Sequence, residues 1–176
     1  MLKEIHNRYT ELDLDSCSNA ESEGWIFETV LNFVKPKNIL EIGFYRGGSS
    51  FLMLSLCDAK LTSIDPIFND TDLYLGRKKE DEFLIHAKEF ESVDKIKKEF
   101  GDRFSFIRKR SDDELPEILG QQFDLLNMDG CHHTEAVRND FNLALKLKIP
   151  FVLADDFVQP PNSPKSVPAI WREEFS

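Results

Sequence analysis

The sequence predicts an α/β domain built on a doubly wound, mostly parallel sheet, and three observations carry this prediction. Short apolar runs alternate with longer segments of helical periodicity, and several runs are nearly continuous in apolar residues, as expected of strands covered on both faces. The repeated order of strand, helix and strand implies right-handed crossovers between parallel strands. The chain has 176 residues, 41% of them hydrophobic, which fits a single domain spanning residues 1–176.

The apolar runs predict five strands. In chain order they are Asn38–Ile42, Leu61–Ile64, Phe104–Ile107, Phe123–Met128 and Phe151–Ala154. Asp124 lies at the start of the fourth of these strands, away from the carboxyl end, so we expect it to serve a turn. After the fifth strand, Gln159–Pro168 contains four prolines and is a predicted loop, followed by a short helix around Ala169–Phe175.

The segments with helical periodicity predict five helices. They are Ser22–Phe33, Ser49–Cys57, Arg77–Phe100, Asp113–Leu119 and Thr134–Leu147. The third is the clearest, because its apolar residues fall on one face, namely Phe83, Ala87, Phe90, Ile96 and Phe100. Gly101 follows it and supplies a stop signal.

The charge balance argues against anionic partners. The chain carries 22 Lys and Arg against 32 Asp and Glu, a formal net charge of −10. Such a surface repels phosphate backbones and anionic lipid, and no local Lys/Arg cluster offsets it. We therefore expect neither nucleic acid nor a membrane as the main partner.

The cysteine pattern and the N-terminal segment point to a reducing compartment. Cys17, Cys57 and Cys131 are widely spaced and form neither a disulfide framework nor a zinc spacing. The segment Met1–Asp15 is polar and acidic and has no signal-peptide pattern. No apolar run approaches the roughly 18 residues of a membrane span. The expected location is cytoplasmic.

Ligands of doubly wound sheets bind outside the carboxyl ends of the strands, so we expect the site residues directly after each strand. The first strand contains Glu41 and runs into Gly43, Gly47 and Gly48, which allow a tight turn and close approach of a ligand. The helix that begins near Ser49 presents free N–H groups. The pattern is neither G-x-G-x-x-G nor a Walker loop, which disfavours NAD and ATP. A purely structural turn is the alternative.

The second and third strands also end in polar residues. Asp65 follows Glu41 at a spacing suited to accepting hydrogen bonds from both ribose hydroxyls of an adenosine ligand. Alternatively, it caps the turn before Pro66. Ser111 and Asp112 can reach an adenine edge, or they can cap the helix that follows.

Three carboxylates follow the fourth and fifth strands, namely those of Asp129, Asp155 and Asp156. Adjacent strands would bring them together, and like charges this close need a cation or a proton between them. Hard oxygen ligands favour Mg²⁺, Ca²⁺ or Mn²⁺ over zinc.

Three segments resemble a known family. The stretch from Glu41 to Ser49, E-I-G-F-Y-R-G-G-S, resembles motif I of class I S-adenosylmethionine (SAM)-dependent methyltransferases, and of small-molecule O-methyltransferases in particular. The segment Asp129–Phe141 is similar to the D-G-x-H-x-Y-E-x-V-x-x-D pattern of bacterial members, with Thr134 in place of the Tyr. A third segment, Glu21–Ile26, resembles the helix that lies over the cofactor.

The resemblance implies a Rossmann-like fold with strand order 3-2-1-4-5 and a set of site residues. Cofactor binding is expected at Glu41, Gly43, Tyr45, Gly47, Ser49, Asp65, Ser111, Asp112 and Asp129. Of these, Glu41 and Gly43 line the methionine part of SAM, Asp65 holds the ribose, and Ser111 borders the adenine. As in catechol-type members, Asp129, Asp155 and Asp156 would bind Mg²⁺, and His132 would be the general base. Its neighbour His133 is expected to face elsewhere.

The resulting expectation is an O-methyltransferase that moves a methyl group from SAM to a hydroxyl of a small molecule, assisted by a divalent metal and by His132. The alternative is an inactive or partner-dependent SAM-binding module, because the C-terminal β-hairpin of the family is not recognisable after Asp155. The edge of the fifth strand would then be covered by a homodimer or by another partner.

Overall fold

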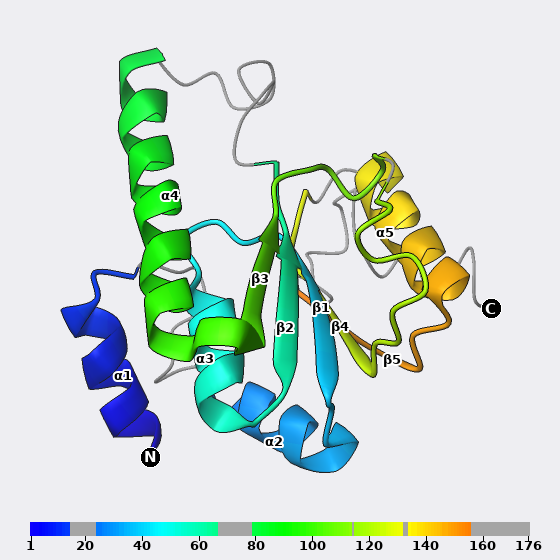
Figure 1. The fold of residues 1–176 in the computed structure, drawn as a ribbon, viewed down its shortest axis with the longest axis horizontal. Coiled ribbons are helices and arrows are strands. Elements are labelled where there is room, and N and C mark those ends of the chain that lie inside the picture. Colours follow the sequence, from blue (N-terminus) through cyan, green and yellow to red (C-terminus); the bar gives the residue numbers. More distant parts are fainter. Residues whose placement is uncertain (15–23, 67–78, 114, 132–133, 156–176) are drawn as a thin grey trace, which may run out of the picture.

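The computed structural model describes residues 1–14, 24–66, 79–113, 115–131 and 134–155. Five parallel strands form one sheet in the order β3-β2-β1-β4-β5 (Figure 1). They are β1 (Asn38–Ile42), β2 (Lys60–Ile64), β3 (Phe104–Ile107), β4 (Leu125–Met128) and β5 (Phe151–Ala154). The predicted fold class and strand order are both confirmed.

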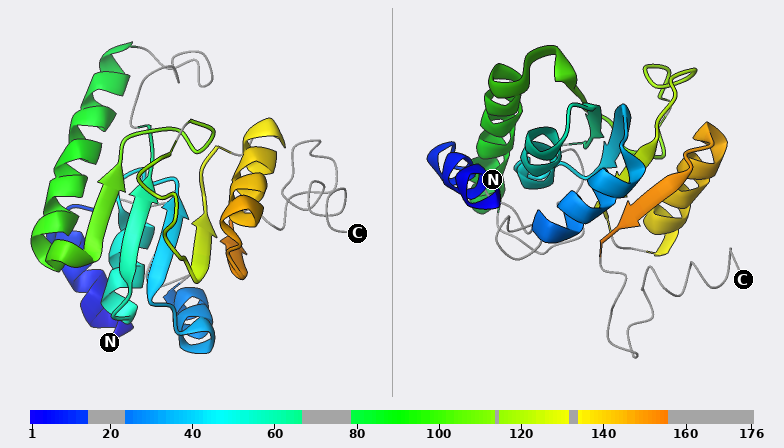
Figure 2. Two further views of the ribbon diagram at one scale, coloured as in Figure 1. Left: turned by 45° about the vertical axis from the view of Figure 1, so that its right-hand side comes forward. Right: turned by 90° about the horizontal axis from the view of Figure 1, so that it is seen from below.

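Helices cover both faces of the sheet, as Figures 1 and 2 show. In chain order they are α1 (Leu2–Glu11), α2 (Gly24–Val34), α3 (Gly48–Leu56), α4 (Lys79–Phe100) and α5 (Thr134–Leu147), and the 3₁₀ turn η2 (Gly101–Arg103) joins α4 to β3. α1 to α4 lie on one side and α5 lies on the other (Figure 2). Within the described ranges, no helix is both long and apolar enough to cross a membrane.

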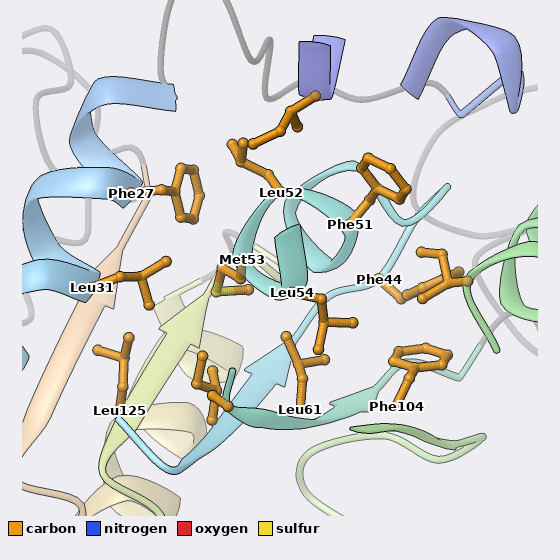
Figure 3. Packing of buried hydrophobic residues seen from close by; sticks show 14 of the residues in the cluster. Phe27, Leu31, Phe44, Phe51, Leu52, Met53, Leu54, Leu61, Phe104 and Leu125 are labelled. Carbon is orange, nitrogen blue, oxygen red and sulfur yellow. The ribbon is translucent and has the colours of Figure 1, made fainter. Parts of the chain in front are cut away.

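The larger of two hydrophobic cores lies between the sheet and the helices α1 to α4. α3 is at its centre, and Phe51, Leu52, Met53 and Leu54 are all at most 2% exposed. Figure 3 shows α3 with Phe27 and Leu31 of α2 on one side and the strand residues Leu61, Phe104 and Leu125 below it. Burial of α3 on nearly all sides explains why its sequence is apolar around the whole helix rather than along one stripe.

The second core lies on the opposite face, where Val137, Phe141 and Ala144 of α5 pack onto the sheet. Leu115 and Ile118, from the segment between β3 and β4, complete this core. Alternate residues of β1 divide between the two cores, because successive side chains of a strand point to opposite faces.

Two elements differ from the sequence-based prediction. A helix is expected at Asp113–Leu119, but residues 116–119 form turns, in which the N–H groups of Ile118 and Leu119 donate to the carbonyls three residues earlier. Pro116 disfavours helical backbone at the residue before it, and turns suffice to bury Leu115 and Ile118. Conversely, α1 was not predicted, because only Ile5 is fully buried in this otherwise polar helix.

The parallel register brings the ends of the central strands to one edge of the sheet. Ile42 of β1 is paired with Ile64 of β2 on one side and with Met128 of β4 on the other. Met128 is in turn paired with Ala154 of β5. The residues that follow these strands, predicted to form a ligand site, therefore emerge side by side.

Candidate functional site

The loop between β1 and α3, residues 43–47, approaches the neighbouring strand very closely. Gly43 has φ = 93°, and a Cβ atom built there would lie 2.0 Å from the carbonyl oxygen of Asp129. Gly47 has φ = 77°, and a Cβ there would lie 2.4 Å from Ile96 of α4. The positive φ favours glycine at both positions, and at Gly43 the backbone of Asp129 leaves no space for a Cβ atom. Close approach of a ligand to this turn stays a prediction.

Asp65, at the end of β2, holds this loop in place. Its Oδ2 atom accepts hydrogen bonds from the backbone N–H of Phe44 at 2.7 Å and of Tyr45 at 3.1 Å. The Phe44 side chain also anchors the loop, since its ring packs against Phe104 and Phe106 of β3. Figure 3 shows Phe44 near Phe104. Asp65 thus connects the end of β2 to the loop that follows β1. Its hydrogen bonding to the ribose of SAM stays a prediction.

Glu41 is the centre of a buried polar row that crosses three strands. The register places it beside Ser63 of β2 and Asn127 of β4. All three residues are at most 3% exposed, and they face the first turn of α3. Glu41 Oε1 accepts hydrogen bonds from Ser49 at 2.6 Å and from Asn127 Nδ2 at 3.4 Å, and its other oxygen accepts one from Ser50. The carboxylate therefore ties the start of α3 to the middle of the sheet.

The surroundings of Glu41 change its acidity. Burial raises the pKa of this carboxyl to about 7, whereas the hydrogen bonds from Ser49 and Ser50 act in the opposite direction. The negative charge of Asp129 adds to the increase. A carboxylate in this position attracts a cationic group, because a neighbouring positive charge would relieve both the burial and the repulsion. The predicted place of Glu41 beside the methionine part of SAM, which carries an ammonium group, is chemically consistent with this environment and stays a prediction.

The segment after β3 contacts α5 through a buried carboxylate. Ser111 Oγ donates a 2.5 Å hydrogen bond to Asp140, which is 1% exposed. The neighbouring Asp112 is exposed and pairs with both Nε and Nη2 of Arg110, an interaction that lowers the pKa of the Asp112 carboxyl. Ser111 and Asp112 border a cavity of about 650 Å³ between residues 111–119 and α5. Their predicted contact with an adenine stays a prediction.

Two of the three expected metal ligands, Asp129 and Asp155, lie within the described residues. The N–H of Asp129 donates to Ile42 at 2.9 Å, and the N–H of Asp155 donates to Met128 at 3.0 Å, so these two residues leave adjacent strands at the same level. Asp156, His132 and His133 lie outside the described residues. Among the residues that the structure does describe, no group of three His, Cys, Asp or Glu side chains is arranged to hold a metal ion.

Three structural partners were not singled out in the sequence: Ser50, Asn127 and Asp140. Asn127 interrupts the otherwise apolar run L-L-N-M, and a polar residue inside a buried strand is a signal that could have been used. Asp140 occupies the last Asp of the D-G-x-H-x-Y-E-x-V-x-x-D pattern, which could have marked it, whereas Ser50 gives no such signal because polar residues are ordinary in helices. The turn role expected of Asp124 is confirmed, since its Oδ2 accepts the N–H groups of Lys37 and Asn38.

Comparison with known proteins identifies the family. A sequence model of a methyltransferase domain matches residues 40–156, which include every described strand except the first two residues of β1. The chain belongs to this methyltransferase family. An uncharacterized protein of Acanthamoeba polyphaga mimivirus is 30% identical over 154 residues, which make up 82% of this chain and 63% of the viral protein.

Solved structures resemble this methyltransferase domain at the level of the fold. An O-methyltransferase from Bacillus cereus in complex with SAH is 19% identical, with a TM-score of 0.59 over 97% of this chain and 75% of that chain. An O-methyltransferase from Streptomyces achromogenes involved in tomaymycin synthesis, in complex with SAM, is 19% identical, with a TM-score of 0.57 over 97% of this chain and 74% of that one.

A SAH-bound methyltransferase from Podospora anserina gives a TM-score of 0.56 at 20% identity, over 89% of this chain and 60% of that chain. The methyltransferase domain described here thus spans less than two thirds of the length of the mimivirus and Podospora proteins.

Proposed function

We propose that this chain is a SAM-dependent methyltransferase that transfers a methyl group to a hydroxyl of a small molecule. The observation that carries the proposal is the glycine loop at residues 43–47, which is pressed against Asp129 on one side and held by Asp65 on the other. The loop lies beside the buried carboxylate of Glu41, in a chain that belongs to a methyltransferase family. Two solved O-methyltransferases of the same fold carry SAM or SAH.

The chemistry of these side chains suits SAM. The cofactor presents an ammonium group and two ribose hydroxyls, which are hydrogen-bond donors and need acceptors. Glu41 and Asp65 lie at the ends of β1 and β2, and the first-turn N–H groups of α3, which have no partner within the helix, would bind the carboxylate of SAM. When bound, SAM supplies an electrophilic methyl group.

The contribution of the protein to such a displacement is largely alignment of the acceptor oxygen with that methyl group. Glu41 would orient the methionine end, because it is fixed by Ser49 and Asn127. Asp65 keeps the backbone of the loop in place at the other side of the proposed site.

The proposal also includes a divalent metal ion and a general base that activate the acceptor hydroxyl. Asp129 and Asp155 leave adjacent strands, and together with Asp156 they would bind a divalent cation that lowers the pKa of the acceptor hydroxyl. His132 would accept the proton. If Asp155→Ala and treatment with a chelator both leave turnover unchanged, the metal has no role. Loss of turnover in His132→Ala with unchanged SAH affinity supports the base.

The proposal is tested by isothermal titration calorimetry of the purified chain with SAM and SAH, followed by methyl transfer from radiolabelled SAM to a panel of phenols, catechols and sugars. Binding together with transfer to a hydroxyl supports the proposal. Absence of any binding contradicts it. Binding without transfer to any acceptor favours the alternative, a SAM-binding module that works through a partner.

We also propose that a second copy of the chain or another protein covers the exposed edge of β5. β5 is the outermost described strand on its side of the sheet. A groove of about 290 Å³ lies between it and α2, and Phe33 and Phe151 form an edge-to-face pair there while remaining 77% and 42% exposed. Light scattering during size-exclusion chromatography would measure whether a homodimer forms.

A further inference from the structure

Arg46 is a buried cation within the glycine loop. Its side chain is 10% exposed, and it lies between two residues with positive φ, Tyr45 at 48° and Gly47 at 77°. Burying a guanidinium is unfavourable unless nearby groups compensate its charge. Two groups that compensate this charge belong to Asp13, near the N-terminus of the chain.

The end of α1 supplies this compensation. Arg46 Nη2 donates a 3.0 Å hydrogen bond to the carbonyl oxygen of Asp13, and the carboxylate of the same residue lies 3.6 Å away. Asp13 follows the last turn of α1, where the helix dipole places its negative end. The carbonyl and the carboxylate of Asp13, just beyond the C-terminus of α1, therefore face one guanidinium.

α1 is itself fixed to the helices behind the proposed site. Tyr9 packs edge-on against Phe51 of α3, with ring centroids 6.3 Å apart. Arg8 forms a two-pronged hydrogen bond with Glu99 of α4, at 2.7 and 3.2 Å. Figure 1 shows α1 next to α4, and Figure 3 shows Phe51 and Phe44 on the same side of the sheet. α1 precedes the residues matched by the family, so this arrangement is not part of the matched region.

We propose that Arg46 is a positioning residue that couples α1 to the glycine loop, so that the docking of α1 sets the affinity of the site for SAM. The inference rests on the proposed function. When α1 is docked, its C-terminal end neutralises Arg46 and the loop keeps the geometry in which Phe44 and Tyr45 donate to Asp65. When α1 is displaced, Arg46 turns to solvent and the loop loses this support.

Three variants separate this role from general stability. Arg46→Met removes the charge and keeps the length of the side chain, and Arg46→Lys keeps the charge. Arg8→Met is the control: it removes an exposed ion pair between α1 and α4, of a kind that contributes little to stability, and leaves α1 docked through Tyr9 and Asp13. A charged hydrogen bond of this kind is worth about tenfold in an equilibrium constant, so Arg46→Met should weaken SAH binding about tenfold. Arg46→Lys should restore part of the affinity, and Arg8→Met should bind SAH like the wild type.

Enzyme kinetics and hydrogen exchange separate a positioning role of Arg46 from a role in overall stability alone. Arg46→Met should raise KM for SAM while kcat at saturating SAM stays within about twofold, because the residue does not touch the reacting atoms. The amides of residues 43–47 should exchange faster in this variant without ligand. Asp13→Lys is a second variant for the case in which Arg46→Met does not fold, since the Asp13 side chain is 71% exposed. It should also weaken SAH binding.

The outcomes are distinguishable. Wild-type affinity and unchanged exchange in Arg46→Met, or equal losses in Arg46→Met and Arg8→Met, overturn the inference and leave the proposed function intact. A fall in kcat without a change in KM overturns it as well. If the wild type itself does not bind SAH, the proposed function fails and this inference fails with it.

Discussion

Gly43 lies so close to Asp129 that a methyl group on its Cα would meet the Asp129 carbonyl oxygen at 2.0 Å. This contact joins the loop after β1 to the end of β4, at the edge where the central strands of the sheet end. No side-chain rearrangement can relieve the overlap, because the backbone fixes the position of a Cβ atom and the Asp129 oxygen is itself a backbone atom. The contact therefore makes a direct prediction about substitution.

Gly43→Ala should abolish SAH binding and lower the stability of the fold. The new Cβ would push the loop away from Asp129, and the φ of 93° adds strain for any residue other than glycine. Gly120→Ala is the matched control, since Gly120 has φ = 83° and open space around its Cβ position. The control should lose about 1 kcal/mol of stability from strain and keep its affinity for SAH, measured by calorimetry and urea unfolding. Equal affinity in both variants would show that the close approach is unimportant for binding.

Asp65→Asn should weaken SAH binding, and this loss of affinity should not follow from the loss of stability alone. Its carboxylate accepts two successive backbone N–H groups of the loop, and Asp124 accepts those of Lys37 and Asn38 in the same way at the opposite end of β1. Asp124→Asn is thus chemically equivalent but distant from the proposed site. Both variants should lose about 1–2 kcal/mol of stability, and only the first should lose affinity. The same loss of SAH affinity in both variants would contradict a role of Asp65 in the binding site.

The buried carboxyl of Glu41 should make stability fall as pH rises. Its pKa is raised to about 7 from 4.5, so the folded protein holds a proton that the unfolded chain has released between these values. Stability contributed by the protonated group is therefore present at pH 4.5 and lost as pH rises through 7. The loss amounts to at most about 3 kcal/mol.

The measurement compares urea unfolding of the wild type and Glu41→Gln at pH 5, 6, 7 and 8 without ligand. The advantage of the variant should grow across this series, because glutamine stays neutral. Glu99→Gln is the control: Arg8 lowers the pKa of Glu99, so its contribution to stability is already complete above pH 5. If the wild-type and Glu41→Gln curves run parallel, Glu41 keeps one charge state throughout this range.

Ser111→Ala should destabilise the fold by about 1–2 kcal/mol, because it removes a hydrogen bond from the buried carboxylate of Asp140. Asp112→Ala, at the neighbouring position, removes an exposed ion pair with Arg110 and should change stability by less than about 0.5 kcal/mol. Chemical denaturation of the two variants provides the comparison. Similar values for both would mean that the contact of Ser111 with Asp140 contributes little.

Local sequence signals were sufficient for most of the fold. The strands at Asn38–Ile42, Phe104–Ile107 and Phe151–Ala154 and the helix at Thr134–Leu147 have the predicted bounds, because apolar periodicity follows directly from burial on one or both faces. The failure at Asp113–Leu119 has an equally local origin in Pro116. α1 was missed for a tertiary reason: most of its side chains stay polar and exposed, and contacts with α3 and α4 hold it in place.

For the site, the sequence determined which residues follow which strand, and it thereby indicated Glu41, Gly43, Asp65, Asp129 and Asp155 as neighbours at one edge of the sheet. The tertiary structure decided what these residues do there. Asp65 holds the loop, Gly43 is pressed against Asp129, and Glu41 is fully buried among Ser49, Ser50 and Asn127. The physical reason is that strand order and alternation are encoded locally, whereas hydrogen-bond partners and burial depend on segments far apart in the chain. The contact of Arg46 with Asp13, 33 residues away, belongs to this second class.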